Sequence, residues 1–141
     1  MRLTAKTYYA LVASVDLTRH YGGAPVRAAS IADKHGIPTR FLELILSELV
    51  NAGIVSSKRG SDGGFYLKSD PNEATVYDVV VTIEGGITIF DCGKISETGQ
   101  CMFTDYMGGL RAAIENYLKN TTLKELSDSA KFELNTLNYV I

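Results

Sequence analysis

Apolar residues recur with helical spacing near the start of the chain. Behind Thr4, four of them stand at positions i, i+3, i+4 and i+7 and predict the apolar face of an amphipathic helix: Tyr8, Leu11, Val12 and Val15. A shorter run predicts a second helix from Ala28 to His35. Gly36 is expected to end that helix, because glycine adopts the left-handed backbone conformation without steric cost.

The most regular helical pattern follows a proline. Pro38 has its backbone angle preset for a first helical turn. From there to about Ala52 the apolar positions form one stripe that is expected to be buried: Leu42, Ile45, Leu46 and Leu49. Two helices joined by a tight turn with a glycine form a helix-turn-helix unit. The pattern therefore predicts such a unit between residues 28 and 52.

Two short segments with strand propensity come next. They are Ile54-Val55 and Phe65-Tyr66-Leu67, and they flank the glycine-rich stretch KRGSDGG. An ordinary hairpin in a small α+β domain is one interpretation. Lys58 and Arg59 favour a DNA-contacting wing instead, because the tip of a hairpin has no structural need for paired cations. The predicted fold class is mainly α with a small β-hairpin wing, a winged helix-turn-helix.

The second half of the chain predicts a connecting helix, a long helix and a short helix. Thr75 and Asp78 have the spacing of a capping box that opens the connecting helix. The long helix spans roughly Thr104 to Lys119, and a capping box at Thr122 opens the short one. One apolar stripe runs along the long helix: Met107, Leu110, Ile114 and Tyr117. A small domain cannot cover such a helix entirely, which predicts dimerisation through it, with packing on its own domain as the alternative.

These elements divide the chain into three parts. Residues 1–70 are the predicted winged helix-turn-helix DNA-binding domain, and residues 71–103 hold the connecting helix and a cysteine-containing loop. Residues 104–141 hold the dimerisation helix and the short C-terminal helix.

Composition and charge narrow the function classes. A hydrophobic content of 45% and a charged content of 21% are ordinary for a globular protein. Residues 1–70 carry nine Lys or Arg against six Asp or Glu, a net of +3, and residues 71–141 carry five against ten, a net of −5. A basic first half suggests a polyanion-binding module. The first residues are too polar for a secretory signal, and no apolar run is long enough to cross a membrane. Two cysteines are typical of a protein in a reducing compartment. We therefore expect a cytoplasmic protein without a membrane partner.

Three stretches together resemble a known family. MRLTAKTYYAL, FLELILSELVNAGIVSSKRGSDGGFYL and DVVVTIEGG are similar to the Rrf-two family of bacterial winged helix-turn-helix transcriptional regulators. That family includes regulators of iron–sulfur cluster assembly, nitric-oxide-sensing repressors and cysteine-metabolism repressors. The resemblance implies a homodimer on a double-stranded DNA operator, acting as a repressor that responds to a redox, iron–sulfur or thiol-related signal. A winged-helix protein–protein interaction module without DNA binding is the alternative. No enzyme is expected, because the two histidines lack a partnered nucleophile, base or metal constellation.

The resemblance places the third helix in the major groove and the wing in the adjacent minor groove. Residues near the start of a recognition helix contact base edges. Arg40 can contact phosphate or guanine, and Glu43 can accept from a cytosine amino group. Leu44 lies beside them, where family members often have a polar residue. The full set of predicted DNA contacts is Lys6, Lys34, Thr39, Arg40, Glu43, Lys58 and Arg59.

Cys92 and Cys101 are the two cysteines of the chain and the predicted sensor. Cluster-binding family members usually present three cysteines here, and the third would fall near Met107. Clusters are normally held by four ligands, so Cys92 and Cys101 form an incomplete set for an iron–sulfur cluster. A reversible disulfide needs no third ligand. Cysteines that only pack, in a regulator that senses a small molecule or a partner protein, are the third interpretation.

Overall fold

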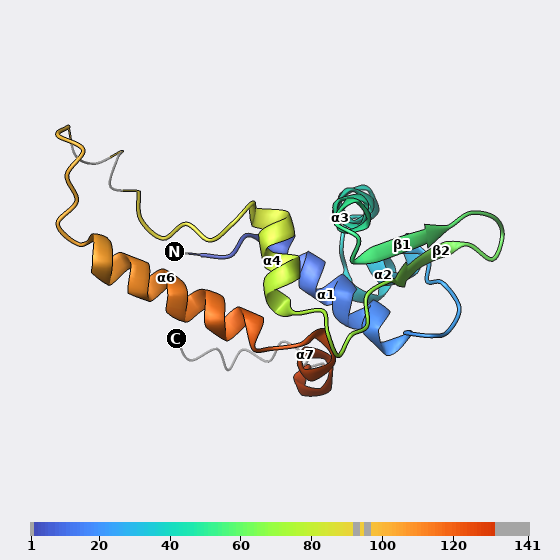
Figure 1. The fold of residues 1–141 in the computed structure, drawn as a ribbon. Coiled ribbons are helices and arrows are strands. Elements are labelled where there is room, and N and C mark those ends of the chain that lie inside the picture. The colour runs from blue at the N-terminus through green and yellow to red at the C-terminus, as the bar shows by residue number, and fades with distance from the viewer. Residues whose placement is uncertain (1, 92–93, 95–96, 132–141) are drawn as a thin grey trace, which may run out of the picture.

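The computed structural model describes residues 2–91, 94 and 97–131 of the 141-residue chain (Figure 1). Within these residues the structure has six helices and one two-stranded antiparallel hairpin. The elements in chain order are α1 (Ala5–Arg19), α2 (Ala28–His35), α3 (Thr39–Asn51), β1 (Val55–Lys58), β2 (Gly64–Leu67), α4 (Val76–Glu84), α6 (Thr104–Lys119) and α7 (Leu123–Ser129). The predicted fold class, a mainly helical winged helix-turn-helix, is confirmed.

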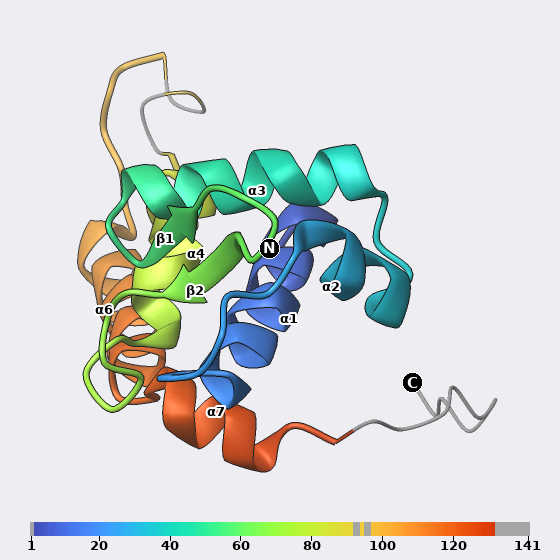
Figure 2. The ribbon, with the colours of Figure 1, turned by 90° about the vertical axis from the view of Figure 1, so that its right-hand side faces the viewer.

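Helix α1 lies at the centre of the molecule, between α3 and α7 (Figures 1 and 2). The core brings apolar side chains from α1, α2 and α3 together with Leu67 at the end of the hairpin. It continues past residue 70, because Ala74, Val79 and Leu123 belong to the same buried cluster. Helices α4 and α7 therefore complete the core of the first half of the chain.

The helix-turn-helix unit forms as its sequence predicts. Gly36 caps α2 in the left-handed conformation, with φ at 68°. Helix α3 follows Pro38, and its predicted stripe is fully buried: Leu42, Ile45, Leu46 and Leu49. The strands extend a few residues further toward the turn than expected, and Lys58 pairs with Gly64 as their last register position.

The apolar stripe predicted for α1 is only partly buried, with Leu11 and Val12 packed against the edge of the core. The core face consists mostly of small and hydroxyl side chains such as Thr7, Ala10 and Ser14, together with the larger Leu17. The apolar stripe lies beside it: Leu11, Val12 and Val15 are half-buried, and Tyr8 is 64% exposed. Small side chains are the ones that let neighbouring helices approach closely, so here size and not hydrophobicity decided which face is buried.

Two capping predictions concern α4 and α7. Thr75 caps α4 in a capping box, since its hydroxyl accepts from the Asp78 amide and its own amide donates to the Asp78 carboxylate. Thr122 caps α7 by accepting from the Glu125 amide at 3.1 Å. The starts of the two helices are joined by the Leu123 amide, which donates to the Ala74 carbonyl at 2.8 Å. This link fixes α7 beside α4.

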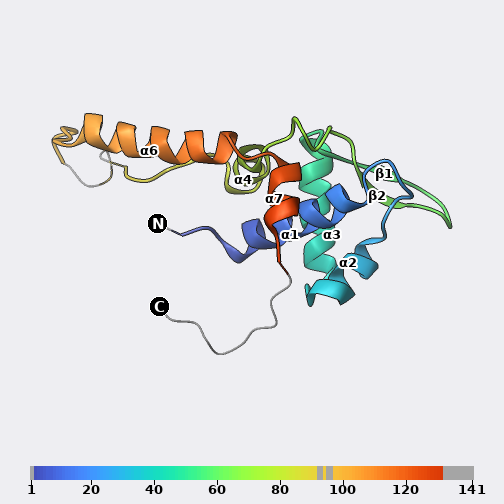
Figure 3. The same ribbon diagram turned by 90° about the horizontal axis from the view of Figure 1, so that it is seen from below.

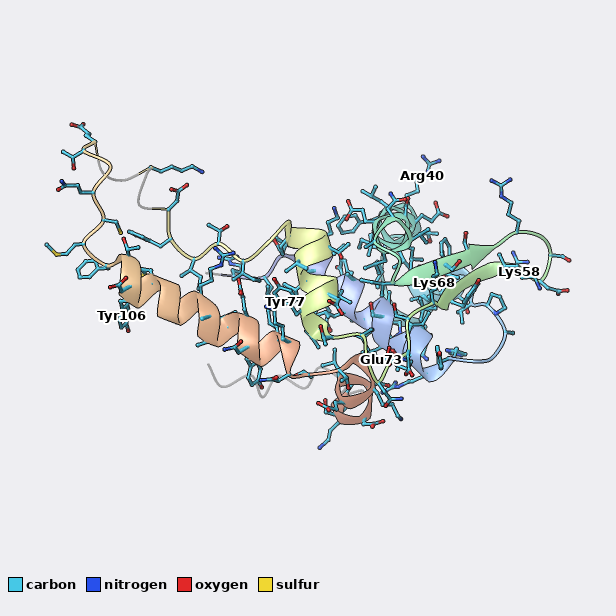
Figure 4. The ribbon with its side chains drawn as sticks, in the orientation of Figure 1. Arg40, Lys58, Lys68, Glu73, Tyr77 and Tyr106 are labelled. Atoms are coloured by element: carbon cyan, nitrogen blue, oxygen red, sulfur yellow. The ribbon has the colours of Figure 1, made fainter. Side chains whose placement is uncertain are left out.

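Helix α6 has the predicted bounds and extends away from the rest of the protein (Figure 3). None of its residues is buried. Its C-terminal end contacts α4, where the Lys119 ammonium lies 4.5 Å from the centre of the Tyr77 ring. Tyr106 lies at the opposite, distant end of α6 (Figure 4). No helix among the described residues is long and apolar enough to cross a membrane.

Gly64 lies close to the backbone of Val26, so its substitution tests how closely the hairpin packs against the segment before α2. Its φ is +150°, and a Cβ there would lie 2.6 Å from the Val26 carbonyl oxygen. Phe65 and Val26 exchange two backbone hydrogen bonds at this point, of 2.7 and 2.8 Å. Gly64→Ala is therefore expected to lower the free energy of unfolding by about 1–3 kcal/mol, measured by urea unfolding.

Gly108→Ala is the control for this substitution. Gly108 lies in α6 with open space where a Cβ would be. Alanine there is expected to leave the protein unchanged or to stabilise it by about 1 kcal/mol. Equal stability of Gly64→Ala and the wild type would contradict the close packing of Gly64 against Val26.

Candidate nucleic-acid interface

The outer face of α3 is a continuous exposed surface opposite the core. Arg40, Glu43, Leu44 and Ser47 stand at i, i+3, i+4 and i+7, and all four are exposed. Arg40 points away from the body of the protein (Figure 4). Thr39, at the start of the helix, is exposed as well. We call Arg40, Glu43, Leu44 and Ser47 the α3 outer face.

Two members of this face were not among the predicted contacts. Ser47 follows from helical periodicity once Arg40 and Glu43 are placed, so its signal was present in the sequence. Leu44 is 52% exposed, which is unusual for a leucine in a helix that buries four other apolar residues. No residue in the described part of the chain covers it fully.

The hairpin presents cations next to α3. Lys58 ends β1 and Arg59 begins the turn, and both side chains are exposed. Lys68, just after β2, is exposed too. Arg27, at the N-terminal cap of α2, donates to the Ser61 carbonyl in the turn, which links the helix-turn-helix unit to the wing. Sequence reasoning missed Arg27, because only the tertiary structure brings it to the hairpin. It also missed Lys68, although that residue directly follows the predicted second strand.

The predicted phosphate contacts Lys6 and Lys34 lie within ion pairs of the domain. The Lys6 ammonium is 2.7 Å from Oε1 of Glu48 on α3. The Lys34 ammonium is 3.4 Å from Oδ2 of Asp16 on α1. Internal carboxylates thus compensate part of both charges. Thr39, Arg40, Glu43, Lys58 and Arg59 have no ion pair of this kind in the described part of the chain.

Asp16 holds α2 against α1. Its side chain is 3% exposed and lies 2.9 Å from Nε2 of His35, besides the contact with Lys34. Nδ1 of His20 is 3.3 Å from its other oxygen. A buried carboxylate is tolerated only with such partners. Both histidines of the chain therefore have a structural setting beside Asp16: His35 at the end of α2 and His20 at the end of α1.

The apolar stripe of α1 lines an open groove of about 430 Å³. The other walls come from α2 and the turn behind it, through His35 and Ile37, and from α7 through Leu126. Tyr8 is the most exposed residue of the stripe.

The cysteine segment is described only in part. Cys92 lies outside the described residues, so its predicted roles as sensor and metal ligand stay predictions. Cys101 is half-buried and is not a free thiol. Within the described ranges, no three His, Cys, Asp or Glu side chains come together as metal ligands. Met107, where a third thiolate would be expected, is half-buried on α6.

Known proteins resemble this chain over almost its full described length. Residues 3–129 match the family described as "Rrf2: Iron-dependent Transcriptional regulator". The HTH-type transcriptional regulator IscR of Photobacterium profundum is 36% identical over 129 residues, which cover 89% of this chain and 75% of that protein. The HTH-type transcriptional regulator CymR of Bacillus subtilis is 31% identical over 127 residues, 90% of both chains.

Solved structures share the fold. CymR (YrzC), described as the global cysteine regulator of B. subtilis, has a TM-score of 0.80 at 29% identity, with 93% of this chain and 99% of that chain covered. IscR of T. potens has a TM-score of 0.76 at 29% identity, with 93% and 89% covered. With its helix-turn-helix unit and wing, this chain belongs to the Rrf2 (Rrf-two) family of helix-turn-helix transcriptional regulators, which are DNA-binding proteins and not enzymes.

Proposed function

We propose that this protein is a homodimeric, sequence-specific repressor whose operator binding responds to thiol oxidation. The α3 outer face carries the proposal, because it presents a cation, a carboxylate and an apolar group side by side and unburied. Such a mixed face suits base edges, which offer acceptors, donors and the thymine methyl group. A protein-interaction module would not need the exposed cations of the neighbouring wing.

Each member of the interface has a chemical role in this proposal. Arg40 donates to guanine or phosphate, and Glu43 accepts from a cytosine amino group. Thr39 and Ser47 supply hydroxyls at the two ends of the same surface. Arg59 enters the minor groove, whose negative potential attracts guanidinium groups. Lys58 contacts phosphate and adds affinity without sequence information.

Leu44 is proposed to contact a thymine methyl group. An exposed leucine on a face that is otherwise polar has no role in the fold, since its α3 neighbours Leu42 and Ile45 already fill the core. On DNA, burial of Leu44 against a methyl group would favour thymine at one operator position. This residue then helps to define which operator is read.

The dimer is supported by two apolar surfaces that a single chain leaves uncovered. Along α6, Met107 and Ile114 are half-buried, Leu110 is exposed, and Tyr117 is 77% exposed. The second surface is the groove beside the α1 stripe. Large exposed apolar areas on one chain indicate an interaction site, and two copies related by a twofold axis bury the same areas on both.

In this proposal the three predicted parts of the chain have separate tasks. Residues 1–70 read DNA, residues 71–103 receive the signal and residues 104–141 mediate dimerisation. Helix α7, which packs on α1 through Leu123 and contacts Arg19, joins the third part to the first.

Thiol oxidation is the favoured signal. Two thiolates fall short of the four ligands of a typical cluster. A crystal structure of the oxidized form of Staphylococcus aureus CymR, with a TM-score of 0.75 at 26% identity, resembles this chain. A reversible bond between Cys92 and Cys101 would change the segment that leads from α4 into α6.

DNA binding is tested by substituting the wing. Arg59→Ala should weaken operator binding and reduce the slope of log affinity against log salt by about one, because a cation that displaces one counterion from the DNA is lost. Fluorescence anisotropy with the protein's own upstream DNA measures both quantities. Lys124→Ala removes an exposed cation of α7 that pairs with Asp128, and should change neither quantity. Absence of salt-sensitive binding at any sequence would support the protein-interaction alternative.

The proposed contact between Leu44 and a thymine methyl group is tested by changing the DNA base. Replacing the contacted thymine by uracil removes only a methyl group, and should weaken wild-type binding by about fourfold, the equivalent of one buried carbon. The Leu44→Ala variant should bind the two operators equally. A uracil scan that affects both proteins to the same extent at every position would contradict the contact.

The signal is tested by anaerobic purification followed by an absorption spectrum and iron and sulfide assays. A colourless protein whose operator affinity changes on thiol oxidation is expected. Cys101→Ser should abolish that change while leaving affinity of the reduced protein intact. A coloured, iron- and sulfide-containing protein that bleaches in air would instead establish a cluster.

A further inference from the structure

Glu84, the last residue of α4, is bound to the first turn of α1. Its Oε1 accepts from the Thr4 amide at 3.1 Å, from the Thr4 hydroxyl at 2.8 Å and from the Thr7 hydroxyl at 2.5 Å. Thr4 is the N-terminal cap of α1, since its hydroxyl accepts from the Thr7 amide. One carboxylate oxygen from a residue far along the chain thus organises the start of the central helix.

The electrostatics of this contact favour an ionised Glu84. The Thr7 hydroxyl and then the two Thr4 donors lower its pKa below the usual 4.5, and Lys6 contributes to the same effect. A negative charge is also favourable at the N-terminus of a helix. The contact is therefore complete at neutral pH and is lost only when the pH falls through this lowered pKa.

The same turn of α1 is also bound to the recognition helix. Lys6 lies between Thr4 and Thr7 in sequence, and its ammonium is 2.7 Å from Oε1 of Glu48 on α3. Oε2 of Glu48 is buried and has no hydrogen-bond partner in the described part of the chain. Both side chains are partly buried, with 27% of Lys6 and 32% of Glu48 exposed, and Lys6 is the cation paired with Glu48 among the described residues.

These contacts form a continuous path from α4 to α3. Glu84 holds Thr4 and Thr7, the turn carries Lys6, and Lys6 holds Glu48, one residue beyond Ser47 of the α3 outer face. Gly85, in the left-handed conformation, ends α4 directly after Glu84 and begins the segment that leads to Cys101. A displacement of the end of α4 would thus be transmitted to α3 by hydrogen bonds and an ion pair.

We propose that Glu84 is a positioning residue that sets the placement of α3, acting through Thr4, Thr7 and the Lys6–Glu48 ion pair. Residues 85–103 then influence DNA reading through this path. The inference rests on the proposed function, since its effect is measured as operator affinity. It also assigns Lys6 an internal role in place of the predicted phosphate contact.

The central experiment is a double-mutant cycle on operator affinity, measured on the full chain. Glu84→Gln and Glu48→Gln remove one charge each without changing size. Each should weaken operator binding roughly fivefold or more, the lower end of typical coupling between sites. The double variant should be little worse than the weaker-binding single variant, because both break one path. Effects that multiply as independent changes would overturn the proposal.

Weaker operator binding could also result from the loss of a helix cap alone. Substitutions of two capping threonines distinguish this explanation from the proposed path. Thr4→Val and Thr122→Val each remove an N-terminal cap hydroxyl, of α1 and α7, and should cost about 1 kcal/mol of stability. Of these two threonines, Thr4 is the one that contacts Glu84. Thermal unfolding verifies that both variants fold to a similar extent. Weaker operator binding of Thr4→Val alone supports the path, and equal binding of the two variants overturns it.

Lys6→Met distinguishes the internal role from a DNA contact. The path predicts lower operator affinity with an unchanged salt slope, whereas a phosphate contact predicts a slope reduced by about one. A reduced slope would overturn the role given to Lys6. If the wild-type protein binds no operator, the proposed function fails as well. If it binds normally and Glu84→Gln binds like the wild type, this inference alone fails.

Discussion

The close packing of other helices around α1 is the constraint on which the rest of the structure depends. Its core face carries Thr7, Ala10, Ala13 and Ser14, all fully buried. Small side chains let α3, α4 and α7 approach the helix. The Ser14 hydroxyl donates within α1, to the Ala10 carbonyl at 2.7 Å, whereas the Thr7 hydroxyl donates to Glu84 of α4. A larger residue on this face would separate α3 from α4, because a packed core has no spare volume.

This arrangement leaves the functional surfaces on the outside. With its inner face fixed against α1, α3 turns Arg40 and its neighbours to the solvent, and the hairpin is held beside it by the Val26–Phe65 bridge. Helix α6 has no place in the core and extends away from it. The α3 outer face, proposed to read DNA, and α6, proposed to pair two chains, thus both lie outside the core that is built around α1.

Polar contacts add directionality to the apolar packing. Asp16 fixes α2 to α1, and the first turn of α1 connects α3 with α4 through Lys6 and Glu84. Burial alone is not directional, whereas a hydrogen bond or an ion pair requires a defined geometry. For a regulator this difference matters, because a shift of a few tenths of an ångström at one end of such a contact is felt at the other.

The local signals of the sequence were sufficient for much of the fold. Periodicity placed α3 and α6, the capping residues Thr75 and Thr122 placed α4 and α7, and KRGSDGG with its flanking strands placed the wing. The quoted stretches also indicated the family, and the exposed positions of Arg40, Glu43, Lys58 and Arg59 follow from the same local patterns. Whether these residues touch DNA stays a prediction.

Tertiary structure alone decided which face of α1 is buried and which charges are paired. The stripe around Tyr8 is the more apolar face, yet the face of Ala10 and Ser14 enters the core, because helix spacing is set by side-chain size. Lys6 and Lys34 read as free cations in the sequence, and their carboxylates stand 42 and 18 positions away. Local periodicity indicates which structure one segment can form. The residues that cover a helix face or pair with a charge come from segments that are distant in the chain.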